Sequence, residues 1–398
     1  MSGSTTGIPR YRRFDGLALL HQGFRPFFLG AGLWALIAMV IWIAAIQGHV
    51  GIPSAFDPVS WHAHEMIFGF VTAVIAGFLL TAIPNWTGRM PLQGRPLAGL
   101  AAVWLVGRFS VLVSGWIGAG TAALLDLSFL ALLLVVVLRE ILAGRNWRNL
   151  PMPIALGGLL AADALTHVDV LGIAATGALG QRLGLGIVVL LIGLVGGRII
   201  PSFTRNWLKK RGEWKFPASF GLFDRLSLIL LAAAMTAWIV APESRLAGGL
   251  LIAAGLVTLL RLTRWRGHRT VAEPLVWSLH LGFAWLPVGL LLLGIASPDL
   301  PAAAGLHALG AGAMAGMPLA VMTRATLGHT GRPLSSDFWT TAIYLMAALA
   351  AAFRVAAPFL PEAHSLLLAL AGSAWVLAFG LFLLRYASIL LRPRDASP

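Results

Sequence analysis

The sequence has 398 residues, of which 58% are hydrophobic and only 11% are charged, and its formal net charge is +14. Soluble domains average about 25% charged residues, so this chain has too few to cover a water-facing surface. It contains no cysteine, which excludes disulfides, iron–sulfur clusters and thiolate ligands and leaves His, Met and carboxylates as metal-binding side chains. We therefore expect an all-α polytopic membrane protein.

Apolar stretches of membrane-spanning length recur along the whole chain and predict twelve transmembrane helices. Because one span needs ~20 apolar residues, the length leaves no room for a separate soluble domain, and we expect a single transmembrane domain over residues 1–398. The predicted spans are 24–47, 62–83, 96–118, 122–142, 150–170, 179–200, 219–241, 246–262, 274–296, 302–325, 339–357 and 364–390.

Lysine and arginine are concentrated at one side of these spans. The alternate loops hold only Arg245, so the positive-inside rule places both termini and the basic loops in the cytoplasm. The charge of +14 is then a signal for membrane insertion, and we expect the lipid bilayer, and no nucleic acid, as partner. The basic segments are 10–13, 89–95, 139–148, 205–215, 261–269, 332 and 392–394.

Spans 2, 6 and 10 contain related sequences. With His64, Gln181 and His307 aligned, similar strings follow at the cytoplasmic ends of the three spans. Because membrane proteins often arise from repeated blocks and place their sites between them, this similarity predicts three pseudo-symmetric blocks of four helices, at residues 24–143, 150–262 and 274–391. The similar strings are AIPNWTGR (82–89), IIPSFTRN (199–206) and ATLGHTGR (325–332).

Three blocks of four helices resemble the catalytic subunit of the heme-copper oxidases, which holds a low-spin heme between histidines of helices 2 and 10. His64 and His307 occupy those two helices here. The resemblance stops at Gln181 in span 6, where that family has a further metal histidine, and span 7 has no pair of histidines. We therefore do not expect an oxygen-reducing binuclear centre.

Buried histidines are the main candidates for cofactor binding, since an ionisable group in the bilayer is costly and faces the bundle interior. His64 and His307 each lie about one turn inside the outer boundary, so their rings could bind a heme b iron from opposite sides. Arg182 and Arg354 are candidates to neutralise its propionates. The alternatives are that the histidines only pack and hydrogen-bond, and that the arginines pair with Asp163, Asp126 or Glu65.

The string HAHEM (62–66) is the densest group of potential metal ligands. At 100° per residue, His62 and Met66 share one helical face and His64 points nearly opposite. An irregular first turn would relax this constraint, and a His, His, Met set suits copper. The alternative is that His62 and Glu65 are hydrated at the interface and only His64 is buried.

Two further histidines lie toward the cytoplasmic side. His280 is about 15 Å in depth from His307 at 1.5 Å per residue, so the two cannot easily share one iron. His280 and His329 form a candidate pair for a second heme. In span 10, Met314 and Met317 are soft potential ligands, but methionine in a core more often fills space.

Several strings carry a resemblance that covers essentially the whole chain. GFRPFF (23–28), HEM (64–66), GFLLTAIPNWTGR (77–89), GGRIIPSFTRN (196–206) and VMTRATLGHTGRP (321–333) resemble the NnrS family. The resemblance implies a bacterial inner-membrane protein that contains heme and copper and is associated with denitrification and the response to nitric oxide. It also implies that the HEM string and the histidines of span 10 belong to the core of the family.

These observations favour a heme protein that handles nitric oxide or transfers electrons near the outer face, with a quinol or a protein as electron donor. A bis-histidine iron has no open position, so nitric oxide chemistry would need one histidine to dissociate or a separate copper ion. Enzymatic turnover is left open. The alternatives are a twelve-helix secondary transporter that uses Arg108 and Asp163, and an assembly or protection factor for nitrogen-oxide enzymes.

Overall fold

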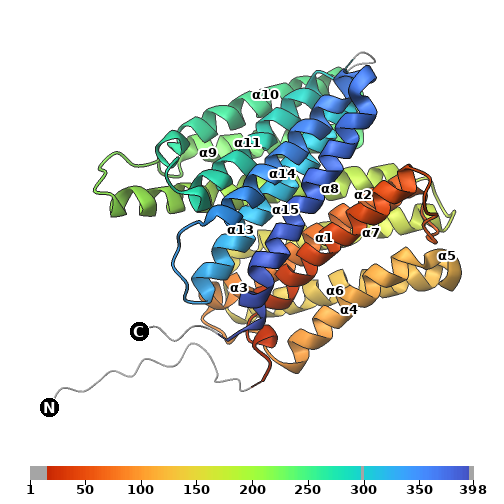
Figure 1. Cartoon of the computed structure of the whole chain (residues 1–398), viewed down its shortest axis with the longest axis horizontal. Helices are drawn as coiled ribbons and strands as arrows, with labels where there is room; N and C mark the ends of the chain where they lie inside the picture. Colours follow the sequence, from red (N-terminus) through yellow and green to blue (C-terminus); the bar gives the residue numbers. More distant parts are fainter. Residues whose placement is uncertain (1–15, 297–299, 394–398) are drawn as a thin grey trace.

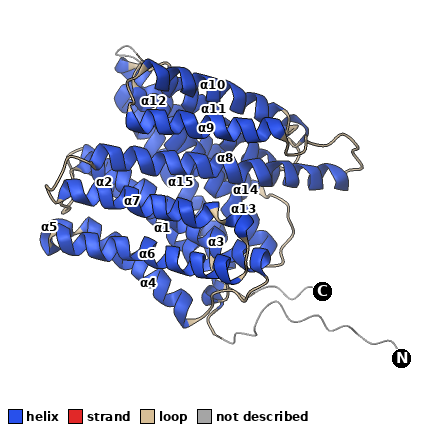
Figure 2. Cartoon of the chain, turned by 180° about the vertical axis from the view of Figure 1, so that it is seen from behind, coloured by secondary structure: helices blue, strands red, loops and turns tan. Residues whose placement is uncertain are grey.

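The computed structural model describes residues 16–296 and 300–393, which form helices joined by loops (Figure 1, Figure 2). Twelve helical segments in these residues are long and apolar enough to cross a membrane. This confirms the twelve spans predicted from hydropathy. The predicted basic residues 10–13 and 394 lie outside the described residues.

The helices follow one another as predicted. The first four spans are α1 (Phe24–Ile46); α2 (Pro58–His64), continued by the π-helical segment η2 (Glu65–Val71) and α3 (Thr72–Thr87); α4 (Arg95–Leu112), with the short α5 (Ser114–Ile117) after it; and α6 (Ala119–Ala143). The next four are α7 (Pro151–Val170), α8 (Gly177–Lys210), α9 (Leu222–Val240) and α10 (Arg245–Thr263). The last four are α11 (Pro274–Gly294); α12 (Ala302–His307), continued by the π-helical segment η5 (Ala308–Ala313) and α13 (Met314–His329); α14 (Phe338–Ala356); and α15 (His364–Leu391).

The second span begins earlier than predicted because its start carries strong local signals. The side chain of Asp57 accepts hydrogen bonds from the N–H groups of Val59 and Ser60, which would otherwise lack partners. Pro58 occupies the first helical position, where its missing N–H costs nothing. The span ends at Gly88, whose φ of 71° is readily adopted by glycine.

Two spans contain a π-helical segment at the same place in the predicted register. η2 begins directly after His64, and η5 begins directly after His307. Such segments are rare within helices and occur often at functional sites. Hydropathy did not predict them, because it reports the length of an apolar run and not its hydrogen-bond pattern.

The spans that carry the predicted register lie toward the inside of the bundle. The buried share of the most apolar stretch is 72% in the second span, 67% in the tenth span and 50% in the sixth span. In the first span it is 28%. α15 packs along α1, so the last helix closes the bundle against the first. The division into three repeated blocks stays a prediction.

Glycine allows helices to contact each other closely in the interior. A Cβ atom at Gly282 of α11 would lie 2.8 Å from the backbone carbon of Gly316 in α13, so neither position has room for a side chain. Small residues let membrane helices approach to backbone contact in this way. Gly316 of the tenth span therefore has a packing role.

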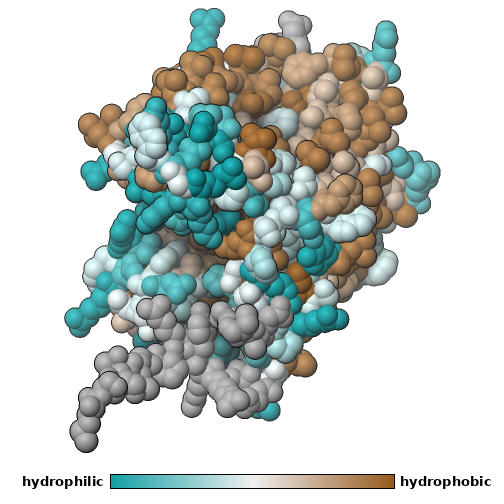
Figure 3. Space-filling model, turned by 60° about the vertical axis from the view of Figure 1, so that its left-hand side comes forward, coloured by the Kyte–Doolittle hydropathy of each residue, from teal (hydrophilic) through white to brown (hydrophobic). Residues whose placement is uncertain are grey.

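The two ends of the bundle differ in charge. The end at which α1 begins and α15 ends holds the lysines and arginines of loops 88–94, 144–150, 211–221 and 264–273, and we call it the basic end. The opposite end, here the acidic end, has no lysine or arginine in its described loops. Arg245 is the first residue of α10 there, and the acidic residues of this end are Asp57, Asp169, Glu243 and Glu362. In Figure 3, hydrophilic residues gather on the face that the view brings forward, and hydrophobic residues cover much of the surface beside it.

Candidate functional site

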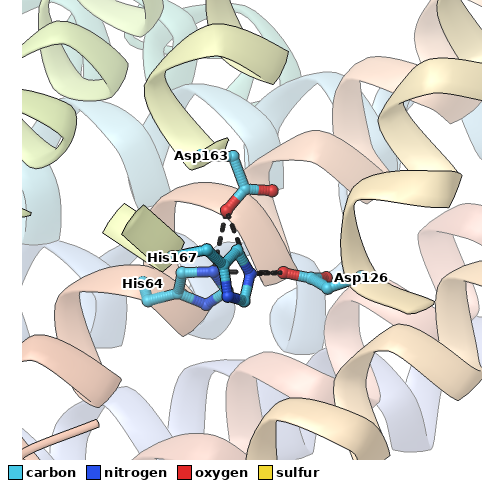
Figure 4. Close-up of side chains that lie close together, drawn as sticks. All are labelled: His64, Asp126, Asp163 and His167. Carbon is cyan, nitrogen blue, oxygen red and sulfur yellow. Dashed lines mark hydrogen bonds and ion pairs between the residues drawn. The ribbon is translucent and has the colours of Figure 1, made fainter. Parts of the chain in front are cut away.

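Four ionisable side chains from three helices meet inside the bundle near its acidic end (Figure 4). His64 ends α2, Asp126 lies on α6, and Asp163 and His167 lie one turn apart on α7. One ligand atom from each lies within 4.8 Å of the others, and each residue is at most 2% exposed. We call this group the His–Asp cluster. At 1.5 Å per residue it lies roughly 10 Å below the acidic end.

Short distances join the two imidazoles to the two carboxylates. Nε2 of His64 lies 2.8 Å from Oδ1 of Asp163 and 3.1 Å from Oδ2 of Asp126. Nε2 of His167 lies 3.0 Å from the same Oδ2 of Asp126 and 3.9 Å from Oδ1 of Asp163. Both imidazole Nε2 atoms therefore point at the space between the two carboxylates.

A second layer of charge surrounds His64. Its Nδ1 lies 3.1 Å from Oε1 of Glu65, so the ring can donate this proton to the carboxylate. Oε2 of Glu65 accepts hydrogen bonds from Nε1 of Trp34 at 2.6 Å and Nη1 of Arg108 at 2.8 Å. Arg108 also donates through Nη2 to Oδ1 of Asp126. The guanidinium of Arg108 thus links the carboxylate of Glu65 to the cluster.

The absence of a side chain at Gly69 leaves space for this second layer. A Cβ atom there would lie 2.7 Å from Nη1 of Arg108 and from Oε2 of Glu65, and 2.9 Å from Nε1 of Trp34. Real Cβ atoms essentially never approach other atoms so closely. Glycine at this position of η2 is therefore required by the ion pair that it faces.

Two aromatic rings pack against the imidazoles of the cluster. The ring of Phe56 lies 4.9 Å from that of His64 and 5.3 Å from that of His167, and Phe68 lies 5.3 Å from His64 on the helix itself. An apolar shell lowers the local dielectric and strengthens every charge interaction inside it. It also raises the cost of any uncompensated charge.

The structure places His62, Arg354 and His307 in a second group. The ring of His62 stacks on Trp42 at 4.6 Å, and its electrostatic neighbours are His307 and Arg354. Nδ1 of His307 lies 2.7 Å from the carbonyl oxygen of Ala303, so Nδ1 donates this proton and Nε2 carries the lone pair of the ring. Nδ1 of His62 and Nη1 of Arg354 are buried and have no hydrogen-bond partner among the described residues.

The predicted heme ligands are not joined by any contact found among the described residues. His64 belongs to the His–Asp cluster, whereas His307 lies in the group with His62 and Arg354. Met66 packs partly buried against the apolar core. His62 and His64 thus contact different parts of the protein, and heme binding by His64 and His307 stays a prediction.

Arg182 does not form the ion pairs considered as its alternative role. Its Nε donates to the carbonyl oxygen of Ile239 at 3.2 Å. The carboxylates of Glu65 and Asp126 pair with Arg108, and that of Asp163 pairs with His64. Its role beside a propionate stays a prediction.

The candidate ligands of a second heme have separate surroundings. Nε2 of His280 lies 2.9 Å from Oγ1 of Thr204, and no residue that the structure describes hydrogen-bonds to its buried Nδ1. The ring of His329 lies 5.5 Å from that of Phe24 and lines a cavity at the basic end. No contact among the described residues joins these two histidines.

Sequence reasoning missed the cluster as a unit, although it identified most of its members. Asp126, Asp163 and Glu65 were expected as partners of arginines, and His64 as a heme ligand. His167 was not among the residues predicted to bind a cofactor. The available signal was a shared depth: on three spans, charged residues lie about 10 Å or less from the same end.

Comparison with known proteins gives one result. A model of the family described as NnrS protein matches residues 18–394. A search of curated proteins found no match. Because the family match covers nearly the whole chain and the chain has twelve membrane-spanning helices, this multi-pass membrane protein belongs to the NnrS family.

Proposed function

We propose that this protein binds one transition-metal ion in the His–Asp cluster and that nitric oxide acts at this ion. The observation that carries the proposal is the convergence of four buried ligand atoms within 4.8 Å. Membership in the NnrS family supports a metal-binding membrane protein of the nitric oxide response. Two imidazoles and two carboxylates form a donor set that copper, iron and zinc accept.

The charge balance of the site favours a divalent cation. Glu65, Asp126 and Asp163 contribute three negative charges, and Arg108 contributes one positive charge. With neutral imidazoles the sum is −2, inside an apolar shell where an unbalanced charge is costly. A divalent ion cancels this charge and leaves both histidines in the neutral form that binds metals.

Glu65 prepares His64 for this role. A histidine that donates one ring proton to a carboxylate presents the lone pair of its other nitrogen, and such outer partners orient metal ligands. Here Nδ1 faces Glu65 at 3.1 Å and Nε2 faces the space between Asp126 and Asp163. The outer carboxylate is itself held by Trp34 and Arg108.

The surroundings determine what such a site can do. A metal ion with four protein ligands can accept a small neutral ligand such as nitric oxide, which needs no charged partner. Phe56 and Phe68 cover the imidazoles, so the site excludes bulky polar molecules. We leave open whether nitric oxide is only bound and sensed or is also converted.

A heme is a second proposal for the outer half, and its best ligands are His62 and His307. His64 is the weaker candidate, because both of its ring nitrogens face carboxylates. His307 presents the lone pair of its Nε2. Within the described part of the chain, Nδ1 of His62 and Nη1 of Arg354 are buried without a hydrogen-bond partner, and the guanidinium is suited to a propionate. The iron would supply redox chemistry; these residues would hold and neutralise the cofactor.

Metal analysis of protein purified in mild detergent tests the main proposal. The wild type should hold close to one copper, iron or zinc ion per chain, and Asp163→Asn and His167→Gln should each lose most of it. His49→Gln is the matched control, because this histidine is exposed at the same end of the bundle. Equal metal content in all four proteins, or no binding after each metal is supplied, contradicts the proposal.

The same cluster would serve a proton-coupled transporter, since Arg108 and Asp163 both belong to it or contact it. In that case two protonated histidines replace the metal as the balancing charge. Transport into proteoliposomes by metal-free protein would favour this function, as would its loss in Asp163→Asn.

An absorption spectrum tests the heme proposal. A Soret band that is lost in His307→Ala, and kept in His364→Ala, would support the heme.

A further inference from the structure

A cavity of about 420 Å³ lies near the basic end, far from the His–Asp cluster. Its walls come mainly from the ends of α3, α8 and α13. This volume suits a small organic ligand, and such pockets are typically apolar with a few polar groups that fix orientation. The aromatic wall residues are Phe24, Phe28, Phe78, Trp86 and Phe203.

The three helices contribute equivalent positions to this cavity. Trp86, Phe203 and His329 each lie 22 residues after the aligned His64, Gln181 and His307, and all three line it. One helical turn earlier, the three helices again contribute aligned residues to the lining. These residues are Ala82, Ile199 and Ala325.

The third helix departs from this symmetry, and its departure introduces polarity. His329 stands where the other two helices have the aromatic residues Trp86 and Phe203. Arg324, five residues before His329, also lines the cavity. Its guanidinium carbon lies 4.2 Å from the centre of the Phe203 ring, which holds the charge against an aromatic face.

Arg324 has no ion pair among the described residues. The carboxylate that acts on it electrostatically is Glu273, but Oε1 of Glu273 accepts the N–H groups of Leu275 and Ser336. No described lining residue is acidic, and the amides of Asn85 and Asn206 add further donors. The cavity therefore offers several hydrogen-bond donors to a ligand that carries acceptors.

An apolar chamber of about 100 Å³ adjoins the cavity on the side of the bundle centre. The two share Phe78, Ile199 and Val321 as lining residues. Every other residue of the chamber is apolar as well, including Met314 and Met317. A ligand that fills both spaces has a ring with acceptors at one end and an apolar chain at the other.

We propose that this cavity binds the head group of an isoprenoid quinone. Its two carbonyl oxygens match the donors of Arg324 and the asparagines, its flat ring matches the aromatic walls, and its tail matches the apolar chamber. A heme is a poorer match, because His280, the predicted partner of His329, does not line the cavity. An anionic lipid head group lacks a ring for the aromatic walls.

The test measures binding of a ubiquinone with a one-isoprene tail to the purified full-length protein. Wild type should bind it saturably, and Arg324→Gln should raise the Kd about 10- to 100-fold, the effect of losing a hydrogen bond to a charged group. Arg198→Gln is the matched control: Arg198 has the equivalent register position on α8 but is exposed and does not line the cavity.

Three results would overturn the proposal. They are an absence of saturable quinone binding, an equal Kd for wild type and Arg324→Gln, and binding of phosphatidylglycerol instead of quinone with the same dependence on Arg324. Thermal unfolding of each variant verifies folding. Because the metal content of Arg324→Gln should equal that of wild type, failure here is distinguishable from failure of the metal site.

Discussion

At the scale of single residues, Glu65 illustrates how the buried charges depend on one another. Its two carboxylate oxygens accept from Trp34, Arg108 and His64. Breaking a buried ion pair by removing one partner usually costs about 3–5 kcal/mol, because the other charge stays buried. An isosteric change that removes only the charge separates the role of Glu65 in orienting His64 from its role in packing.

We expect Glu65→Gln to lower the metal affinity of the His–Asp cluster by about 10- to 100-fold, the usual effect of losing an outer-shell partner. The amide keeps the shape of the side chain but no longer favours the tautomer of His64 that binds metal. Metal titration of the stripped protein measures the change. Glu362→Gln, an exposed position at the same end, is the control, and an equal affinity in both variants would refute the orienting role.

Asp337, which lies outside the membrane-spanning segments, should make the stability of the protein depend on pH. Partial burial opposes its ionisation, but hydrogen bonds from Thr340 and Arg385 outweigh this effect and lower its pKa. A carboxyl whose folded pKa is lowered stabilises the protein above its unfolded pKa, about 3.9, and loses this contribution as the pH falls through the folded pKa.

The melting temperature of wild type should therefore exceed that of Asp337→Asn at pH 7, and the gap should shrink below about pH 4. The effect is small, because the carboxylate is 39% exposed and solvent screens the pair. Thermal unfolding in detergent at several pH values measures it. A gap that widens on acidification would show that the hydrogen bonds do not favour the ionised form.

At the scale of elements, hydropathy was sufficient for the number and order of helices but not for their internal geometry. Each span contains a stretch of 18 residues with high mean hydropathy, so its existence follows from composition alone. The π-helical segments η2 and η5 contact other helices of the bundle, and an apolar run does not encode their hydrogen-bond pattern. α8 extends to Lys210, beyond the predicted residue 200, because a basic segment can continue a helix outside the bilayer.

Two glycines of η5 provide a test of packing at this scale. A Cβ atom at Gly312 would lie 2.4 Å from the Trp285 ring, whereas one at Gly310 would meet nothing within 4 Å. Gly312→Ala should therefore destabilise the protein by about 1–3 kcal/mol through overpacking. Gly310→Ala should be neutral or stabilise it by up to about 1 kcal/mol. Thermal unfolding of both variants measures this, and equal melting temperatures would contradict the close contact.

At the scale of the whole molecule, the sequence revealed the depth of each charged residue but not its direction. His64 and Asp163 are 99 residues apart, and only the arrangement of α2 beside α7 brings them together. Because His64 and His307 lie at a similar depth in the outer half of the bundle, the sequence was compatible with the two rings facing each other. The direction depends on how twelve helices are arranged around one another, which periodicity within a single span does not determine.

The charge difference between the two ends of the bundle predicts its orientation in the membrane. Because basic loops are retained in the cytoplasm, Lys210 at the basic end should be cytoplasmic and Glu243 at the acidic end should face outward. The chain has no cysteine, so Lys210→Cys and Glu243→Cys each introduce a unique thiol at an exposed position. A membrane-impermeant maleimide added to spheroplasts should label Glu243→Cys at once and Lys210→Cys only after lysis, while wild type stays unlabelled. The reverse pattern would show that the basic end faces outward, and it would place the His–Asp cluster near the cytoplasm.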